Sequence, residues 1–138
     1  MTFSNNKAQI NEHPMPGISN RVRNLLVVED EPLIAMLLQD ELEALGVHVI
    51  GPVSNLKSAL RLAQMPNLDG ALLDRNINGT FADEVADTLH NRQIPFVFVS
   101  AYERPGGLKH RDVPVLHKPF GKIEFRLALL ALLERTNP

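Results

Sequence analysis

The chain of 138 residues alternates between short apolar runs and longer segments in which apolar residues recur at helical spacing. Apolar runs without a polar face are typical of strands that are buried on both sides of a sheet. Such runs occupy 25–28, 47–53, 70–74, 96–99 and 113–117, and the helical patterns occupy 32–45, 55–64, 82–92 and 123–135. Strands that alternate with helices in this way predict an α/β domain whose parallel sheet is covered on both faces.

The first two predicted helices carry recognisable start signals. Pro32 suits the first helical turn, because its φ angle is fixed and the first turn leaves its N–H groups unpaired in any case. Asp30 or Glu31 would cap this helix, and Ser54 or Asn55 would cap the next one.

Two segments interrupt the regular pattern. Residues 76–79 read Asn-Ile-Asn-Gly and predict a tight turn. Pro105 and the pair Gly106-Gly107 argue against a full helix between the last two strands. We therefore expect a loop or a short, irregular fourth helix over 103–112.

Composition narrows the class of protein. Hydrophobic residues make up 44% and charged residues 22%, which is ordinary for a globular domain. A net charge of -2 gives no basic footprint for nucleic acid, and the absence of cysteine excludes disulfides and thiolate chemistry. No apolar run approaches the roughly 18 residues of a membrane helix, and no secretory signal pattern is present. We expect a cytoplasmic protein without nucleic-acid or membrane partners.

The chain divides into a tail and one domain. Residues 1–24 are rich in Asn, Pro and Gly and lack periodicity, so we expect a flexible N-terminal tail. Residues 25–138 would form the domain. Because nothing follows Pro138, a stand-alone domain is favoured, although excision from a longer chain stays open.

Charged and hydroxyl residues stand where the predicted strands end. Glu29 and Asp30 follow the first strand, Asp74 ends the third, Ser100 ends the fourth and Lys118 follows the fifth. In an open parallel sheet these points lie along one edge, where ligands bind. Carboxylates with a backbone carbonyl suit Mg²⁺, and a lysine would offset the charge of a phosphoryl group.

Each of these residues also has an ordinary interpretation. A strand-end acid or Ser100 can be a helix cap, and a lysine before a turn is usually solvated. Their joint occurrence favours a site in which Asp74 attacks phosphorus and becomes an acyl phosphate. The sequence Lys118-Pro119 could also hold a cis peptide bond that orients the ammonium.

These residues together resemble the receiver domain of two-component response regulators, the CheY-like family. The segment 26–32 (Leu-Val-Val-Glu-Asp-Glu-Pro) resembles the acidic-pair motif, and 118–120 (Lys-Pro-Phe) resembles the lysine signature. Asp74 matches the phosphoacceptor and Ser100 the switch hydroxyl. The resemblance implies a flavodoxin-like, doubly wound sheet of five strands in the order 2-1-3-4-5.

The resemblance also implies a cofactor, a partner and a role. Mg²⁺ would be held by Glu29 through water, by Asp30, by Asp74 and by the backbone carbonyl of Asn76. Asp74 would accept a phosphoryl group from a histidine kinase or a phosphotransfer protein, assisted by Lys118. The domain would then be a switch rather than an enzyme, acting only on its own modification.

One part of the family pattern is missing. The usual aromatic switch residue would fall at Val115, which is not aromatic. Residues 95–102 (Pro-Phe-Val-Phe-Val-Ser-Ala-Tyr) instead resemble the atypical subgroup nicknamed FATGUY, although Ser100-Ala101 replaces its Thr-Gly. Tyr102 then becomes the candidate switch aromatic, and we expect it to act with Ser100.

The last predicted helix has two apolar stripes, of which packing on a sheet needs one. Phe125, Leu129, Leu132 and Leu133 form the first stripe, and Ile123, Leu127 and Leu130 form the second on nearly the opposite side. The second stripe indicates a homodimer or a downstream protein partner, unless the segment 103–112 covers it.

Three other function classes are alternatives to a phosphorylated receiver domain. A phosphohydrolase of the haloacid-dehalogenase type would need Asp-x-Asp after the first strand, where this chain has Glu-Asp-Glu at 29–31. A nucleotide-binding module would need a Gly-rich phosphate loop there. A receiver-like interaction domain that is never phosphorylated is the main alternative, although every acidic, hydroxyl and lysine position is filled.

Overall fold

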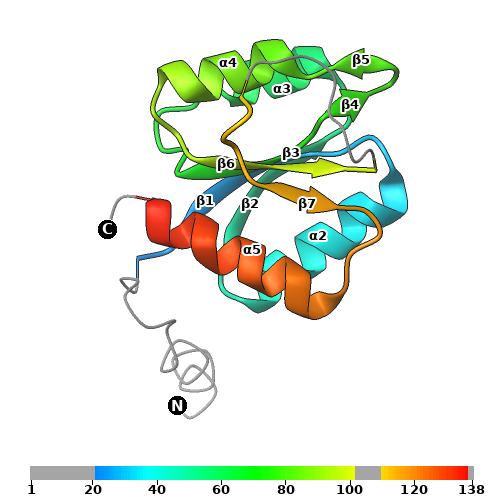
Figure 1. The fold of residues 1–138 in the computed structure, drawn as a ribbon. Helices are drawn as coiled ribbons and strands as arrows, with labels where there is room; N and C mark the ends of the chain where they lie inside the picture. Colours follow the sequence, from blue (N-terminus) through cyan, green and yellow to red (C-terminus); the bar gives the residue numbers. More distant parts are fainter. Residues whose placement is uncertain (1–20, 102–109, 137–138) are drawn as a thin grey trace.

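The computed structural model describes residues 21–101 and 110–136 and shows a five-stranded parallel sheet with helices on both faces (Figure 1). The strand order is β2-β1-β3-β6-β7, which is the order 2-1-3-4-5 that the family resemblance implied. The strands are β1 (Asn24–Val28), β2 (His48–Val53), β3 (Gly70–Asp74), β6 (Phe96–Ser100) and β7 (Val115–His117). The helices within the described residues are α2 (Pro32–Ala44), α3 (Leu56–Leu62), α4 (Asp83–Asn91) and α5 (Lys122–Arg135).

The three inner strands are apolar throughout because both of their faces are covered. All of β3 and β6 is buried, and so is β1 after its first residue. One core layer lies between the sheet and α3 and α4, and the other lies between the sheet and α2 and α5 (Figure 1). Alternating side chains of the same strand enter opposite layers, as Leu26 and Val27 do.

The parallel register brings the strand ends together. Val28 pairs with Leu73, Asp74 pairs with Val99, and Ser100 pairs with His117. The residues that follow β1, end β3 and follow β7 therefore emerge at the same edge of the sheet, as expected from the sequence.

A short hairpin rises from this edge. It consists of β4 (Asn76–Ile77) and β5 (Thr80–Phe81), which pair antiparallel. Asn78 and Gly79 have φ angles of 53° and 86°, and two positive φ angles in a two-residue turn are the signature of the Asn-Gly hairpin. The predicted tight turn is confirmed.

The helix starts match the sequence signals in different ways. Asn55 caps α3 by accepting a hydrogen bond from the Ser58 N–H at 2.8 Å. Glu31 occupies the cap position of α2, but its side chain accepts no hydrogen bond from the helix.

The domain begins before the boundary drawn from the sequence. Residues 21–24 were assigned to the tail, yet Asn24 opens β1 and Arg21 forms an ion pair with Asp69 at 2.8 Å. Arg23 is buried, and its Nε donates to the Thr136 hydroxyl at 2.7 Å. These contacts could not be predicted from the pattern of apolar residues, because they are made by polar side chains.

Two other predictions stand differently. The last strand is shorter than expected, since β7 covers 115–117 rather than 113–117. Of the irregular stretch 103–112, only 110–112 lie within the described residues, where they form turns. No helix of the described part is long and apolar enough to span a membrane.

Candidate functional site

Four carboxylates converge at the edge where the central strands end. Glu29, Asp30 and Glu31 follow β1, and Asp74 ends β3. Each contributes an oxygen to a group whose members lie within 4.8 Å of one another. Glu29 and Asp74 are buried, whereas Asp30 is half-buried and Glu31 is exposed. Three of the four were predicted from the sequence as site residues, whereas Glu31 was predicted only as a helix cap.

Lys118 places its ammonium among these acids. Its Nζ donates to Glu29 Oε2 at 3.0 Å, to Glu31 Oε1 at 3.0 Å and to Asp74 Oδ2 at 3.1 Å. Its backbone N–H donates to the Ser100 carbonyl at 2.8 Å, which continues the β6–β7 pairing by one residue. The Lys118–Pro119 peptide bond is cis, as the sequence suggested.

Backbone N–H groups fix the orientation of the acids. The Asn76 N–H donates to Asp74 Oδ1 at 3.0 Å, and the Glu31 N–H donates to Glu29 Oε2 at 3.1 Å. The Asn78 N–H at the hairpin turn donates to Asp30 Oδ2 at 2.8 Å. The carboxylates of Asp74, Glu29 and Asp30 are thereby each held in one orientation.

The concentration of charge alters the protonation of two groups. Burial, and next the hydrogen bond and charge of Asp74, raise the pKa of Glu29 to about 7 against the lowering effect of the hydrogen bonds from Lys118 and the Glu31 N–H. Burial lowers the pKa of Lys118, but its contacts with Glu29, Glu31 and Asp74 outweigh burial and raise it overall. Lys118 is therefore a permanent cation, whereas the charged form of Glu29 is disfavoured.

The donor set fits a hard divalent cation. Carboxylate oxygens are the ligands that Mg²⁺ takes in proteins, usually with several waters retained. Among the described residues, Glu29 Oε1 is a buried oxygen that accepts no hydrogen bond, although Lys118 Nζ lies 2.9 Å away. A cation near Glu29, Asp30 and Asp74 would satisfy that oxygen and lower the repulsion between the acids.

The remaining predicted site residues lie around this centre. Ser100 is buried at the end of β6, next to the strand that carries Asp74. Asn76 follows β3, and its side-chain oxygen accepts a hydrogen bond from the Gly79 N–H at 2.9 Å. Tyr102 lies outside the described residues. The metal-binding role of the Asn76 carbonyl and the switch roles of Ser100 and Tyr102 stay predictions.

Arg75 is a buried cation that was not predicted from the sequence. It follows Asp74 directly, and its guanidinium lies 4.3 Å from the centre of the Phe98 ring. Burial lowers the pKa of Arg75, while the charge of Asp83 raises it. The position of Arg75 directly after a strand-end acid was the available signal, but a charged residue there is ordinarily exposed.

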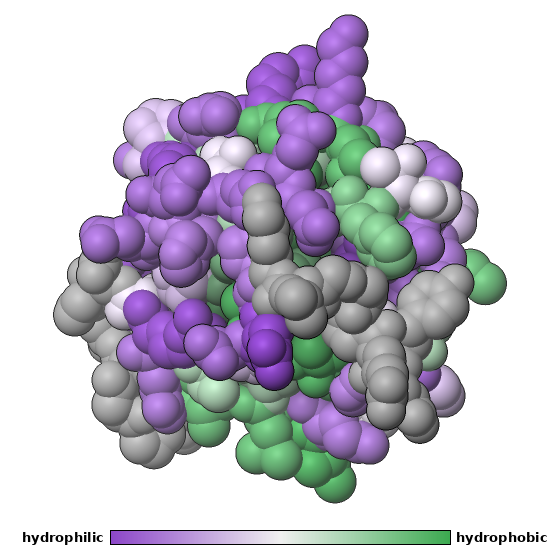
Figure 2. All heavy atoms as spheres, turned by 45° about the horizontal axis from the view of Figure 1, so that its top comes forward, coloured by the Kyte–Doolittle hydropathy of each residue, from purple (hydrophilic) through white to green (hydrophobic). Residues whose placement is uncertain are grey.

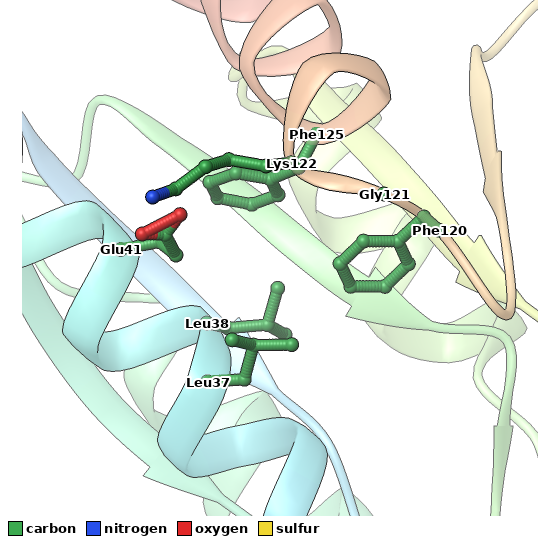
Figure 3. Close-up of a pocket in the computed structure, with 7 residues that line it drawn as sticks. All are labelled: Leu37, Leu38, Glu41, Phe120, Gly121, Lys122 and Phe125. Atoms are coloured by element: carbon green, nitrogen blue, oxygen red, sulfur yellow. The ribbon is translucent and has the colours of Figure 1, made fainter.

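A separate groove runs between α2 and the start of α5 (Figure 3). Its volume is about 340 Å³, and in the close-up Leu37 and Leu38 face the rings of Phe120 and Phe125. The two rings stack with centres 5.9 Å apart. The groove contains no residue of the acid cluster, so it is a feature of the surface rather than of the site.

Apolar side chains at the surface form separate patches. On the face shown in Figure 2, hydrophobic side chains gather in several places between hydrophilic ones. The second stripe of the last helix is exposed at Ile123 and Leu127, at 73% and 63%, whereas Phe125 and Leu129 are buried. The helix therefore has one face in the core and one in solvent, as predicted.

Comparison with known proteins gives concordant results. The family model described as response regulator receiver domain matches residues 25–129. The phyllosphere-induced regulator PhyR of Methylorubrum extorquens is 34% identical over 101 residues, which are 70% of this chain and 38% of that protein. This chain thus spans less than half the length of that relative.

Solved structures agree in fold. SdrG of Sphingomonas melonis Fr1 is 40% identical with a TM-score of 0.72, covering 86% of this chain and 99% of that one. The BeF3-activated conformation of SdrG, from Pseudomonas melonis Fr1, is 42% identical with a TM-score of 0.67. This match covers 80% of this chain and 95% of that one. A third structure is the receiver domain of the sensor histidine kinase PA1611 of Pseudomonas aeruginosa PAO1, which has magnesium coordinated in its active site cleft. It shares the fold at 22% identity and a TM-score of 0.68, and the match covers 82% of this chain and 98% of that one.

Proposed function

Because this chain belongs to the response regulator receiver domain family, we propose that it accepts a phosphoryl group on Asp74 in the presence of Mg²⁺ and thereby switches its contacts with other proteins. One observation carries the proposal: the Lys118 ammonium lies 3.1 Å from Asp74 within a cluster of four carboxylates. A lone acid at a strand end needs no such counter-charge. The BeF3-activated conformation of SdrG and the magnesium-bound receiver domain of PA1611 support the same chemistry.

The proposed reaction is transfer from the phosphohistidine of a histidine kinase or a phosphotransfer protein. An Asp74 oxygen forms a bond to phosphorus, the P–N bond of the donor breaks, and its electron pair remains on the imidazole nitrogen. Lys118 offsets the negative charge that accumulates as the phosphoryl group approaches Asp74. Mg²⁺, held by Glu29, Asp30 and Asp74 with the Asn76 carbonyl, would supply the remaining charge neutralisation.

Signal transmission would need more than one contact. Moving a two-state equilibrium from mostly off to mostly on takes about 5.5 kcal/mol of differential interaction. One hydrogen bond to a charged group supplies roughly 1.5–3 kcal/mol. We therefore assign the switch to Ser100 and Lys118 together, with Tyr102 as the candidate aromatic two residues after Ser100.

The proposed partners follow from the proposed phosphorylation of Asp74 and from the exposed stripe of α5. An upstream kinase or phosphotransfer protein would supply the phosphoryl group, and the exposed stripe of α5 would meet a second copy or a downstream protein. We propose a cytoplasmic switch that has no substrate other than its own aspartate. The alternative is a receiver-like domain that binds partners without phosphorylation. The experiment must distinguish this alternative from the phosphorylated switch.

The test is intact mass after incubation with Mg²⁺ and a small phosphodonor. Wild type should gain one phosphoryl adduct, and the Asp74→Asn variant should gain none. Ser100→Ala should keep the adduct but weaken the phosphorylation-dependent contact; an unchanged contact would remove Ser100 from the switch. An unmodified wild type would favour the phosphorylation-independent domain, and turnover of an added phosphoester would favour a phosphohydrolase.

A further inference from the structure

Glu31 uses its side chain in an unusual way for its position. An N-cap side chain ordinarily accepts a hydrogen bond from one of the first backbone N–H groups of the helix. Glu31 is the N-cap residue of α2 and makes no such bond. Its Oε1 accepts a hydrogen bond from Lys118 Nζ at 3.0 Å instead. The side chain is therefore committed to the lysine rather than to the helix.

This contact completes the set of partners that Lys118 can have. An ammonium has three N–H donors, and here they are directed to Glu29, Glu31 and Asp74 at 3.0, 3.0 and 3.1 Å. A phosphoryl oxygen on Asp74 can gain a hydrogen bond from Lys118 only when one of these contacts is given up.

Glu31 is the partner that Lys118 can release most readily. The side chains of Glu29 and Asp74 are 0% and 6% exposed, whereas that of Glu31 is 58% exposed. A buried carboxylate that loses its cation is left as an uncompensated charge, which is strongly unfavourable. Water rehydrates an exposed carboxylate, so its ion pair is weak. Release of Glu31 leaves no buried charge unpaired.

We infer that Glu31 is a positioning residue for Lys118, which holds one N–H of the ammonium away from Asp74 until a phosphoryl group competes for it. The inference rests on the proposed phosphorylation of Asp74. Glu31 then acts as a brake on modification, because Lys118 can reach an incoming phosphoryl group while still holding Glu29 and Asp74 only after its contact with Glu31 is broken. The rate at which Asp74 is modified is set in part by a residue that does not touch the phosphoryl group.

The test compares two quantities at saturating Mg²⁺: the rate of adduct formation from a small phosphodonor, and the apparent affinity for beryllofluoride. Glu31→Gln should raise both by about two- to fivefold, which is the range that an exposed ion pair supports. Glu41→Gln is the matched control, because it removes the same charge from the same helix. Glu41 lines the groove between α2 and α5 and is not part of the acid cluster, so this variant should keep wild-type values.

Glu31→Asp separates the contact from the charge. Aspartate keeps the negative charge, but it is one methylene shorter and well suited to cap the helix, so both quantities should approach those of Glu31→Gln. Wild-type values for Glu31→Asp would show that only the charge of the site matters and would overturn the inference. A rate for Glu31→Gln at or below wild type would do the same.

Mg²⁺ affinity provides the last discrimination. Glu31→Gln should bind Mg²⁺ as wild type does. A loss of about tenfold or more, the size seen when a ligand or its support is removed, would assign Glu31 to the metal instead and overturn the inference. A wild type that takes no adduct would refute the proposed function itself, whereas a modified wild type with an indifferent Glu31→Gln would refute only the role of Glu31.

Discussion

At the scale of single residues, Glu29 is a side chain whose protonation changes on folding. Burial and the neighbouring Asp74 together raise its pKa from an ordinary value of 4.5 to about 7, against the opposing effect of Lys118. A carboxyl group whose pKa rises on folding stabilises the folded state only while it is protonated. Its contribution is fully present below about pH 4.5 and is lost as the pH rises through about 7.

Glu29→Gln should therefore change the pH dependence of stability. Without Mg²⁺ the variant should match wild type near pH 5 and exceed it near pH 8, by an unfolding free energy on the order of 1–3 kcal/mol. Urea unfolding at the two pH values measures the difference, with the exposed Glu134→Gln as control. A difference that is the same at both pH values would show that Glu29 keeps its ordinary pKa in the folded protein.

At the scale of elements, α5 carries apolar side chains on a solvent-exposed face as well as on its buried face, and packing against the sheet requires only the buried face. Phe125, Leu129, Leu132 and Leu133 close the core layer shared with α2, whereas Ile123 and Leu127 lie in solvent. Exposed apolar stripes rimmed by polar residues are typical of surfaces that meet another protein.

Leu127→Glu should weaken association through α5 without lowering phosphorylation of Asp74. The introduced charge would have to be desolvated in any interface on this stripe, which costs free energy unless a partner charge is present. Sedimentation of the phosphorylated protein measures self-association, and intact mass measures phosphorylation. The exposed Gln64→Glu adds the same charge beyond α3 and serves as control. Association equal to that of wild type in Leu127→Glu would exclude the stripe as a contact surface for a second copy.

At the scale of the whole molecule, the start and the end of the domain are tied together. The buried Arg23 donates its Nε–H to the Thr136 hydroxyl at 2.7 Å, and that hydroxyl donates to the Leu133 carbonyl at 2.7 Å. The bond joins residues 113 positions apart and ties the residue before β1 to the residue after α5.

Thr136→Val should lower the free energy of unfolding, because it leaves a buried donor of Arg23 without this acceptor. The expected loss is about 1–3 kcal/mol, measured by urea unfolding, and phosphorylation should be unchanged. Thr80→Val, an exposed position in β5, is the control and should be nearly neutral. A neutral Thr136→Val would mean that the guanidinium finds an equivalent partner.

Much of this architecture could be predicted from the sequence, because strands that are buried on both faces consist of continuous apolar runs. The same runs located Asp74 and Lys118, since their charges end each run abruptly. Glu31 was missed because an acid before a helix has an ordinary explanation as a cap. Arg21 and Arg23 were assigned to the tail because their partners, Asp69 and Thr136, are distant in sequence. Polar contacts across such separations leave no local pattern.

The hairpin turn hydrogen-bonded to Asp30 has a practical consequence. The Asn78 N–H joins the tip of the β4–β5 hairpin to the Asp30 carboxylate. We therefore expect a change in the surroundings of Asp30 to shift the exposed tip of this hairpin. The native chain contains no cysteine, so one introduced at Thr80 would be a unique attachment point. A fluorophore there would turn the hairpin into an optical reporter of site occupancy, readable in real time without separating modified from unmodified protein.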